Sequence, residues 1–233
     1  MSIRLVALFA SLVALPATAL AATEYSLRSP QIPVQGGALQ GFFIALGEPL
    51  DVQHDQLDAQ LMQMYVNTNS TYTIQIECAA KDDGLSLGLY DGSTLTPWLA
   101  QLFPASAGPG WFAVASFRSS PARVVVNLFD ANASLQGTTT ILGGNRQAIG
   151  FYAQDPNRMI YSQDSRNPGG AAQVLFFDGI SPYSDAIWIA FEASARAAGA
   201  DDDFNDAVLL LEQNSFVGPV KHTSWGSLKA RFR

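Results

Sequence analysis

Ile187–Glu192 (IWIAFE) and Ala207–Leu211 (AVLLL) are two apolar runs, and the acidic segment Asp201–Asp206 (DDDFND) leads directly into the second run. Short runs rich in branched and aromatic residues are typical of buried β-strands. The acidic segment carries four carboxylates and one amide within six residues. Like charges at this density repel one another unless water or a cation lies between them. The pattern predicts two strands joined through an acidic turn, and any chemistry is expected at that turn.

Upstream of this pair, the chain continues in short strand-like segments. Thr71–Ala79 alternates polar and apolar residues cleanly, and turn residues recur about every ten positions after it. Further strands are expected at Leu85–Tyr90, Gly110–Arg118, Arg123–Asp130, Thr138–Leu142, Ala148–Ala153, Met159–Ser162 and Gln173–Asp178. Many short strands separated by Gly, Pro, Asn and Asp turns indicate an all-β fold, a β-sandwich or jelly roll, over residues 71–217.

The segment before this body, residues 22–70, is harder to assign and is interpreted as a lead-in or as the N-terminal part of the β domain. Ala38–Leu46 is apolar and bounded by glycines, which indicates a first strand. Leu50–Gln63 has helical leanings, although Met62–Val66 could equally begin a strand. Thr94–Pro109, inside the β body, contains Pro and Gly and is expected to be a long connection.

The first 21 residues have the pattern of a secretory signal peptide. Arg4 provides the positive start, Leu5–Leu15 the apolar stretch, and Ala19–Ala21 a small-x-small cleavage site. We expect cleavage after Ala21 and export of the mature chain. No later apolar run approaches the length of a membrane span.

Cys78 is the only cysteine, so the chain cannot form an intramolecular disulfide. It alternates with polar residues in step with Ile74 and Ile76, which predicts a position on the core face of a strand. There it is expected to behave as a small hydrophobic residue rather than as a reactive thiol.

Charge is distributed unevenly along the chain. Residues 22–212 contain 20 acidic and 8 basic residues, a net charge of −12, whereas Lys221–Arg233 carries +4. An acidic body argues against nucleic acid as a partner, because such binding depends on neutralising phosphates. The basic tail, residues 218–233, would place Trp225, Leu228 and Phe232 on one helical face. It is interpreted either as a solvated or docked C-terminus or as a sorting or membrane-surface tag.

The acidic turn is the candidate metal site of the chain. We expect its ligands to be Glu192, Asp201, Asp203, Asn205 and Asp206, with backbone carbonyls or water completing the six to eight oxygens that calcium takes. An EF-hand does not fit, because Asp206 stands where that loop needs glycine and an apolar run follows it. The alternative is a solvated acidic turn without an ion, since Asp and Asn favour turns in any case.

Several short motifs occur in an order and spacing that resemble a secreted bacterial family, domain of unknown function 4114, found in PEP-CTERM and adhesin-like surface proteins. The likeness covers roughly residues 71–212. The motifs that carry it are Ala148–Tyr152, Ile160–Ser162, Asn167–Gly170, Phe191–Glu192 and Asp201–Asp206.

The resemblance implies a calcium-binding, non-enzymatic β-sandwich of the cell surface or extracellular matrix, with a structural or adhesive role. The sequence departs from the family pattern in two respects. Ala193 follows Phe191–Glu192 where the family usually has Asp, so one possible ligand is missing. The Pro-Glu-Pro motif and membrane span of PEP-CTERM proteins are also missing from this sequence, and the basic tail occupies that position.

Few residues of the sequence support an enzymatic interpretation. His54 and His222 are the only histidines, too few for a His-rich zinc site and poorly suited to a Ser-His-Asp triad. Glu192 with one aspartate could imitate the carboxylate pair of a glycoside-acting enzyme. A calcium-dependent carbohydrate-binding module is the stronger alternative, in which Trp98, Trp111, Trp188 or several tyrosines would stack on sugar rings.

Overall fold

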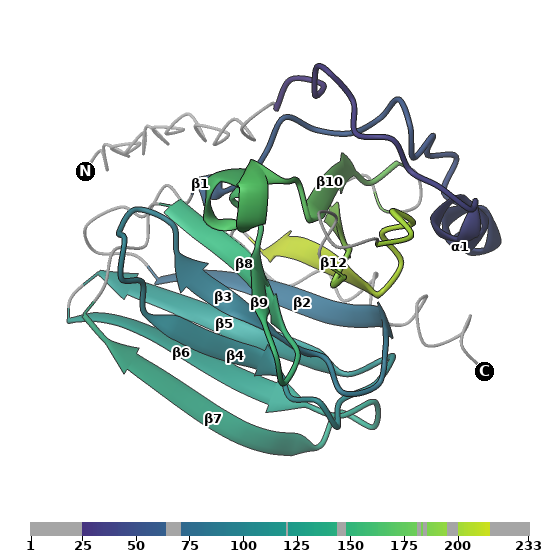
Figure 1. Cartoon of the computed structure of the whole chain (residues 1–233). Helices are drawn as coiled ribbons and strands as arrows, with labels where there is room; N and C mark the ends of the chain where they lie inside the picture. Colours follow the sequence, from purple (N-terminus) through teal and green to yellow (C-terminus); the bar gives the residue numbers. More distant parts are fainter. Residues whose placement is uncertain are drawn as a thin grey trace, which may run out of the picture.

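The computed structural model describes residues 25–63, 71–119, 121–143, 148–180, 183, 186–194 and 200–214. These residues form two antiparallel β-sheets, one α-helix and two short 3-10 turns (Figure 1), so the all-β prediction is confirmed at this level. The predicted signal peptide, residues 1–21, and the basic tail, residues 218–233, lie outside the described residues.

The larger sheet has seven strands in the order β10-β11-β12-β2-β5-β6-β7. Their bounds are β2 Thr71–Lys81, β5 Phe112–Ser119, β6 Ala122–Phe129, β7 Leu135–Leu142, β10 Val174–Asp178, β11 Ala186–Phe191 and β12 Ala207–Asn214. The two predicted apolar runs are thus adjacent strands, and β12 also pairs with β2 at the centre of the sheet.

The smaller sheet has five strands, with β1, β8, β3 and β4 in order and β9 paired beside β8. Their bounds are β1 Met62–Gln63, β3 Ser86–Asp91, β4 Leu99–Phe103, β8 Ala148–Gln154 and β9 Met159–Tyr161. The turns η1 (Asp164–Arg166) and η2 (Pro168–Gly170) follow β9.

The main core fills the space between the two sheets. Ile74, Ile76 and Cys78 of β2 face Leu89 and Phe151 of the smaller sheet's apolar side within one buried cluster. Cys78 therefore lies where the alternation predicted, and burial raises the pKa of its thiol to about 12. A thiol so far from ionisation behaves as a small apolar group.

A second core lies on the outer face of the larger sheet, over β10, β11 and β12. Helix α1 (Ala38–Leu46) packs Leu39 and Phe43 against Trp188, and residues further along the segment add to the same cluster. Glu48, buried just after the helix, accepts hydrogen bonds from the Ile180 N–H at 2.9 Å and from the Trp188 indole N–H at 3.4 Å. The N-terminal segment is thereby attached to half of the sheet's outer face.

The prediction of a strand at Ala38–Leu46 is wrong, because this segment is helix α1. Gly37 and Gly47 adopt left-handed φ values of 76° and 78°, which end the helix on both sides. Leu39, Phe43 and Leu46 recur at helical spacing on the buried face. The glycines that suggested strand boundaries are helix caps.

The helical leaning of Leu50–Gln63 is also not realised. Asp51 Oδ1 accepts the N–H groups of Gln53 and His54, at 2.9 and 3.1 Å, and this turn interrupts any helix. Met62–Gln63 forms β1, as the alternative interpretation allowed. Residues 64–66 of that alternative lie outside the described residues.

The predicted connection Thr94–Pro109 contains a strand, β4, between Pro97 and Pro104. Ala100 and Leu102 point into the main core on alternate positions, and β4 pairs with β3. Among the described residues no helix has the length and apolar character needed to cross a membrane.

Candidate functional site

Strand pairing gathers the acidic segments of the chain at one end of the larger sheet. Phe191 pairs with Ala207, which places Glu192, at the end of β11, beside the segment Asp201–Asp206 that enters β12. Ala207 also pairs with Lys81, so the turn after β2 reaches the same place. Three chain segments therefore meet where the sequence predicted the metal site.

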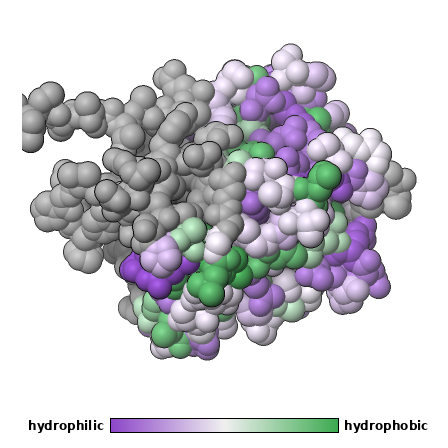
Figure 2. All heavy atoms as spheres, turned by 90° about the vertical axis from the view of Figure 1, so that its left-hand side faces the viewer, coloured by the Kyte–Doolittle hydropathy of each residue, from purple (hydrophilic) through white to green (hydrophobic). Residues whose placement is uncertain are grey.

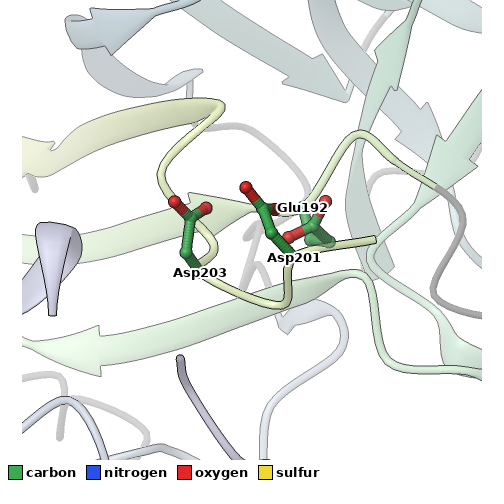
Figure 3. A group of neighbouring side chains, drawn as sticks. All are labelled: Glu192, Asp201 and Asp203. Carbon is green, nitrogen blue, oxygen red and sulfur yellow. The ribbon is translucent and has the colours of Figure 1, made fainter. Parts of the chain in front are cut away.

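Three carboxylates come together at this end of the sheet. Oxygen atoms of Glu192, Asp201 and Asp203 lie within 4.8 Å of one another, and Figure 3 shows Asp201 between the other two side chains. Glu192 is buried, Asp203 is partly buried and Asp201 is exposed. Carboxylate oxygens at such separations can approach one cation, with the open side left to water.

Glu192 is held in place by the backbone around it. Its Oε1 accepts the Ser194 N–H at 3.1 Å, and its Oε2 accepts a longer bond from the Phe204 N–H at 3.5 Å. These bonds orient the carboxylate toward the acidic segment. They leave acceptor capacity on both oxygens, because each carboxylate oxygen has two lone pairs.

The backbone of the acidic segment alternates in an unusual way. Asp202 and Phe204 have φ values of 58° and 54°, in a region that bulky residues seldom occupy. Phe204 is fully buried in the second core, and the Gln35 N–H donates to the Asp202 carbonyl at 2.8 Å. Anchoring Phe204 inward turns the side chains of Asp203 and Asn205 toward the partly exposed side.

Asn205 and Asp206 take positions different from those of the three central carboxylates. The Asn205 side-chain amide donates to Asp203 Oδ2 at 2.5 Å, and its backbone N–H donates to Asp203 Oδ1 at 3.2 Å. Asp206 Oδ2 accepts the Ala193 N–H at 2.5 Å. Asn205 therefore orients Asp203 in this structure, while Asp206 closes the turn and adds negative charge; whether either contacts an ion stays a prediction.

Burial and mutual repulsion disfavour the ionised state of these carboxyl groups when no cation is bound. Burial, followed by the charge of Asp206, raises the pKa of Glu192 to about 7. Burial also raises the pKa of Asp203, with Asp201 and Asp206 adding to the shift. The ion pairs among the described residues are Arg28–Asp164, His54–Asp51 and Arg158–Asp155, and none neutralises these groups.

Asp82, in the turn after β2, is a member of the acidic end that sequence reasoning missed. Burial raises its pKa, and the Asp206 carboxylate facing it raises the pKa further. Its N–H donates to the Asp206 carbonyl at 2.8 Å. Lys81 does not neutralise it, because the ammonium donates to the backbone carbonyls of Asp82 and Ala105. A pocket of about 200 Å³ opens beside Asp82, Asp206 and Asp155.

The other motifs behind the family resemblance have structural roles. Gly150 lies under the ring of Tyr90, where a Cβ would come within 2.2 Å of it, so only glycine fits. Asn167 exchanges two 2.8 Å hydrogen bonds with the backbone of Tyr161 and donates a third to Ala171. These residues hold the loop after β9 in place and add no ligand to the acidic site.

The tryptophans proposed for sugar stacking are poorly placed for that task. Trp188 is buried in the second core, so its interpretation as an external stacking platform is wrong. Trp98 and Trp111 are partly buried and pack against the main core, and the Trp98 indole N–H is covered.

Comparisons with known proteins found no matching family model, no matching curated protein and no matching solved structure. The resemblance to domain of unknown function 4114 therefore stays a prediction.

Proposed function

We propose that this chain is an exported bacterial module of the cell surface or extracellular matrix, a β-sandwich whose acidic turn binds calcium and whose role is structural or adhesive. The observation that carries the proposal is the convergence of Glu192, Asp201 and Asp203 without a neutralising cation among the described side chains. Hard carboxylate oxygens are the donors that calcium prefers.

A calcium ion here would relieve two costs of the folded state at once. It would offset the repulsion among the carboxylates, and it would favour the ionised form of Glu192 against the effect of burial. The three residues would supply part of the six to eight oxygens, and water or carbonyl groups the remainder. Asn205 and Asp206 would support the ligands through the hydrogen bonds already described.

The site would also join separate parts of the chain. Glu192 follows β11, the aspartates precede β12, and Gln35 of the N-terminal segment bonds to Asp202 within the turn. An ion held by these groups would stabilise the folded state by mass action, because the unfolded chain lacks the arrangement. This favours a structural role for the metal over a catalytic one.

A glycoside-acting enzyme receives less support. Glu192 is fully buried, so the glycosidic oxygen of a bulky substrate has no direct approach to its carboxylate. A general acid must come within hydrogen-bond distance of the atom that it protonates.

Calcium titration by calorimetry of the mature chain beginning at Ala22 tests the proposal. We expect saturable calcium binding and a melting temperature that falls in chelator. Asp203→Asn should remove most of both effects, since it deletes one ligand charge.

Asp58→Asn is the matched control, because Asp58 is exposed. The hydrogen bond of Asp58 is donated by its backbone N–H to the Ser26 carbonyl and does not involve the carboxylate. It should leave calcium binding unchanged. A chain that shows no binding heat, and that melts at the same temperature with and without chelator, would overturn the calcium proposal.

A further inference from the structure

The outer face of β5, β6 and β7 differs from the rest of the larger sheet because no described element packs over it. Alternation sends Phe117 and Val124 into the main core and leaves their neighbours on the outer side. Thr138 and Thr140 of β7 are exposed there, and Ser116 of β5 is partly exposed. The result is a sheet surface that is exposed over β7 and partly exposed over β5 and β6, and we call it the open face.

Two arginines stand side by side at one end of the open face. Arg118 of β5 and Arg123 of β6 are direct cross-strand partners next to the β5–β6 turn. Their inward neighbours Phe117 and Val124 belong to the core, so both guanidinium groups lie on the outer side. Like charges placed directly opposite each other destabilise a sheet.

Neither arginine is neutralised within the described residues. The three ion pairs there involve other groups, and no hydrogen bond is recorded for either guanidinium. The Nε–H of Arg123 is covered and has no acceptor. The chain has a net charge of −7, yet neither of these two adjacent cations forms an ion pair with a described carboxylate. An anionic ligand would offset their repulsion and accept hydrogen bonds from the other guanidinium N–H groups.

The remainder of the open face is uncharged and rich in hydroxyl and amide groups. Thr138 Oγ1 donates to Asn127 Oδ1 at 2.8 Å, and Thr73 Oγ1 lies 3.4 Å from Ser116 Oγ. At the far end Phe112 and Phe129 stack with ring centroids 4.8 Å apart, but Phe112 is buried, so this pair is not an exposed platform. The hydroxyl and amide groups of this surface suit the hydroxyls of a sugar chain.

We propose that the open face docks a carboxylated polysaccharide, a polyuronate, with Arg118 and Arg123 as the carboxylate-binding pair. A guanidinium fork matches a carboxylate through two parallel hydrogen bonds. A densely charged polyanion such as nucleic acid or a highly sulfated glycan fits less well, because the site offers two cations on an acidic molecule.

This surface is separate from the acidic turn. Arg118 pairs with Thr71 at one end of β2, whereas the acidic turn meets Lys81 at the other. Residues ten positions apart along a strand are separated by roughly 33 Å. The open face therefore binds its ligand without calcium, and the failure of either proposal leaves the other standing.

Calorimetry with polygalacturonate, in excess chelator so that the polymer carries no calcium, tests this inference on the mature chain. We expect binding by the wild type, and Arg118→Gln and Arg123→Gln should each weaken it at least ~10-fold through the loss of a charge-assisted pair. Arg158→Gln is the matched control, since it removes the same charge from a residue paired with Asp155 elsewhere, and it should bind normally.

A second variant guards against misfolding. Thr140→Glu keeps both arginines but adds a negative charge at an exposed position of the open face, diagonal to Arg123, and it should also weaken binding. Neutral dextran should not bind, and dextran sulfate should bind more weakly than polygalacturonate. The proposal is overturned if the wild type does not bind polygalacturonate, if dextran sulfate binds more tightly, or if Arg158→Gln loses as much affinity as the open-face variants.

Discussion

The two halves of the larger sheet's outer face differ in whether another element covers them. Over β10, β11 and β12, Leu175, Trp188 and Leu210 are covered by α1 and the segment that follows it. Over β5, β6 and β7, the corresponding positions carry Ser116, Val125 and Thr140, and no described element covers them. One sheet thus has a half buried on both faces and a half with one face toward solvent.

The difference can be read in the sequences of the strands. β11 (AIWIAF) and the first part of β12 (AVLLL) are continuously apolar, as strands buried on both faces require. β6 (ARVVVNLF) and β7 (LQGTTTIL) place polar residues among the apolar ones. Continuous runs therefore indicate that another element must cover the sheet.

The largest effect is expected where α1 meets the covered half. Phe43 is fully buried against Phe177 and Trp188, so Phe43→Ala should lower the free energy of unfolding by roughly 3–5 kcal/mol. Ile44→Ala, on the exposed side of the same helix, should change it by about 0.5 kcal/mol or less. Denaturant unfolding measures both, and equal losses would contradict the assignment of the buried face.

Glu77 lies on the border between the halves, opposite Leu210 on one side and Phe112 on the other. Burial, and then the charge of Glu212, raises its pKa from 4.5 to about 8. The folded state therefore favours the protonated form. The stability linked to Glu77 is complete below pH 4.5 and is lost as the pH rises through about 8.

Glu77→Gln should remove this loss, because the amide stays neutral. The unfolding free energy of the variant minus that of wild type should rise by on the order of 2–4 kcal/mol as the pH increases from 4.5 to 8. Unfolding measured at each pH gives this difference. Titrating groups that do not interact with Glu77 cancel in that difference. A difference that does not change with pH would show that Glu77 is not buried as described.

A matched pair of substitutions compares the halves directly and should give the smallest effects. Val208→Thr buries a hydroxyl in the second core and should cost about 1–3 kcal/mol. Val125→Thr makes the same chemical change on the open face, where water reaches the new hydroxyl, and should cost about 0.5 kcal/mol or less. Chemical denaturation again distinguishes them, and similar costs would mean that the open face is covered.

The strand pattern of the β body was predictable because its alternation and apolar runs are local signals. Helix α1 was not recognised, since the glycines on either side of Ala38–Leu46 are equally common at strand ends. The spacing of Leu39, Phe43 and Leu46 contained the helical signal. β4 was missed because Pro97 and Pro104 obscured a five-residue strand between them.

The candidate site was predictable in part for the same reason. Glu192, Asp201 and Asp203 are close in sequence across one strand connection, and the structure brings their carboxylates together. Asp82 was not predictable, because its proximity to Asp206 depends on the register between β12 and β2. A single sequence contains no signal for that register. The inward anchoring of Phe204, which sets the directions of its neighbours, is likewise a tertiary effect.

Strand β7 has a consequence for how the molecule behaves in concentrated solution. It ends the larger sheet, its eight residues include no charge and no proline, and Leu135 and Leu142 are largely exposed. On the side of the molecule that Figure 2 shows, hydrophobic residues reach the surface among hydrophilic ones. An uncharged edge strand of this length is a template for edge-to-edge aggregation. The colloidal stability of this chain therefore depends on repulsion from its net charge of −7, so precipitation should begin as the pH approaches the isoelectric point near 4.6.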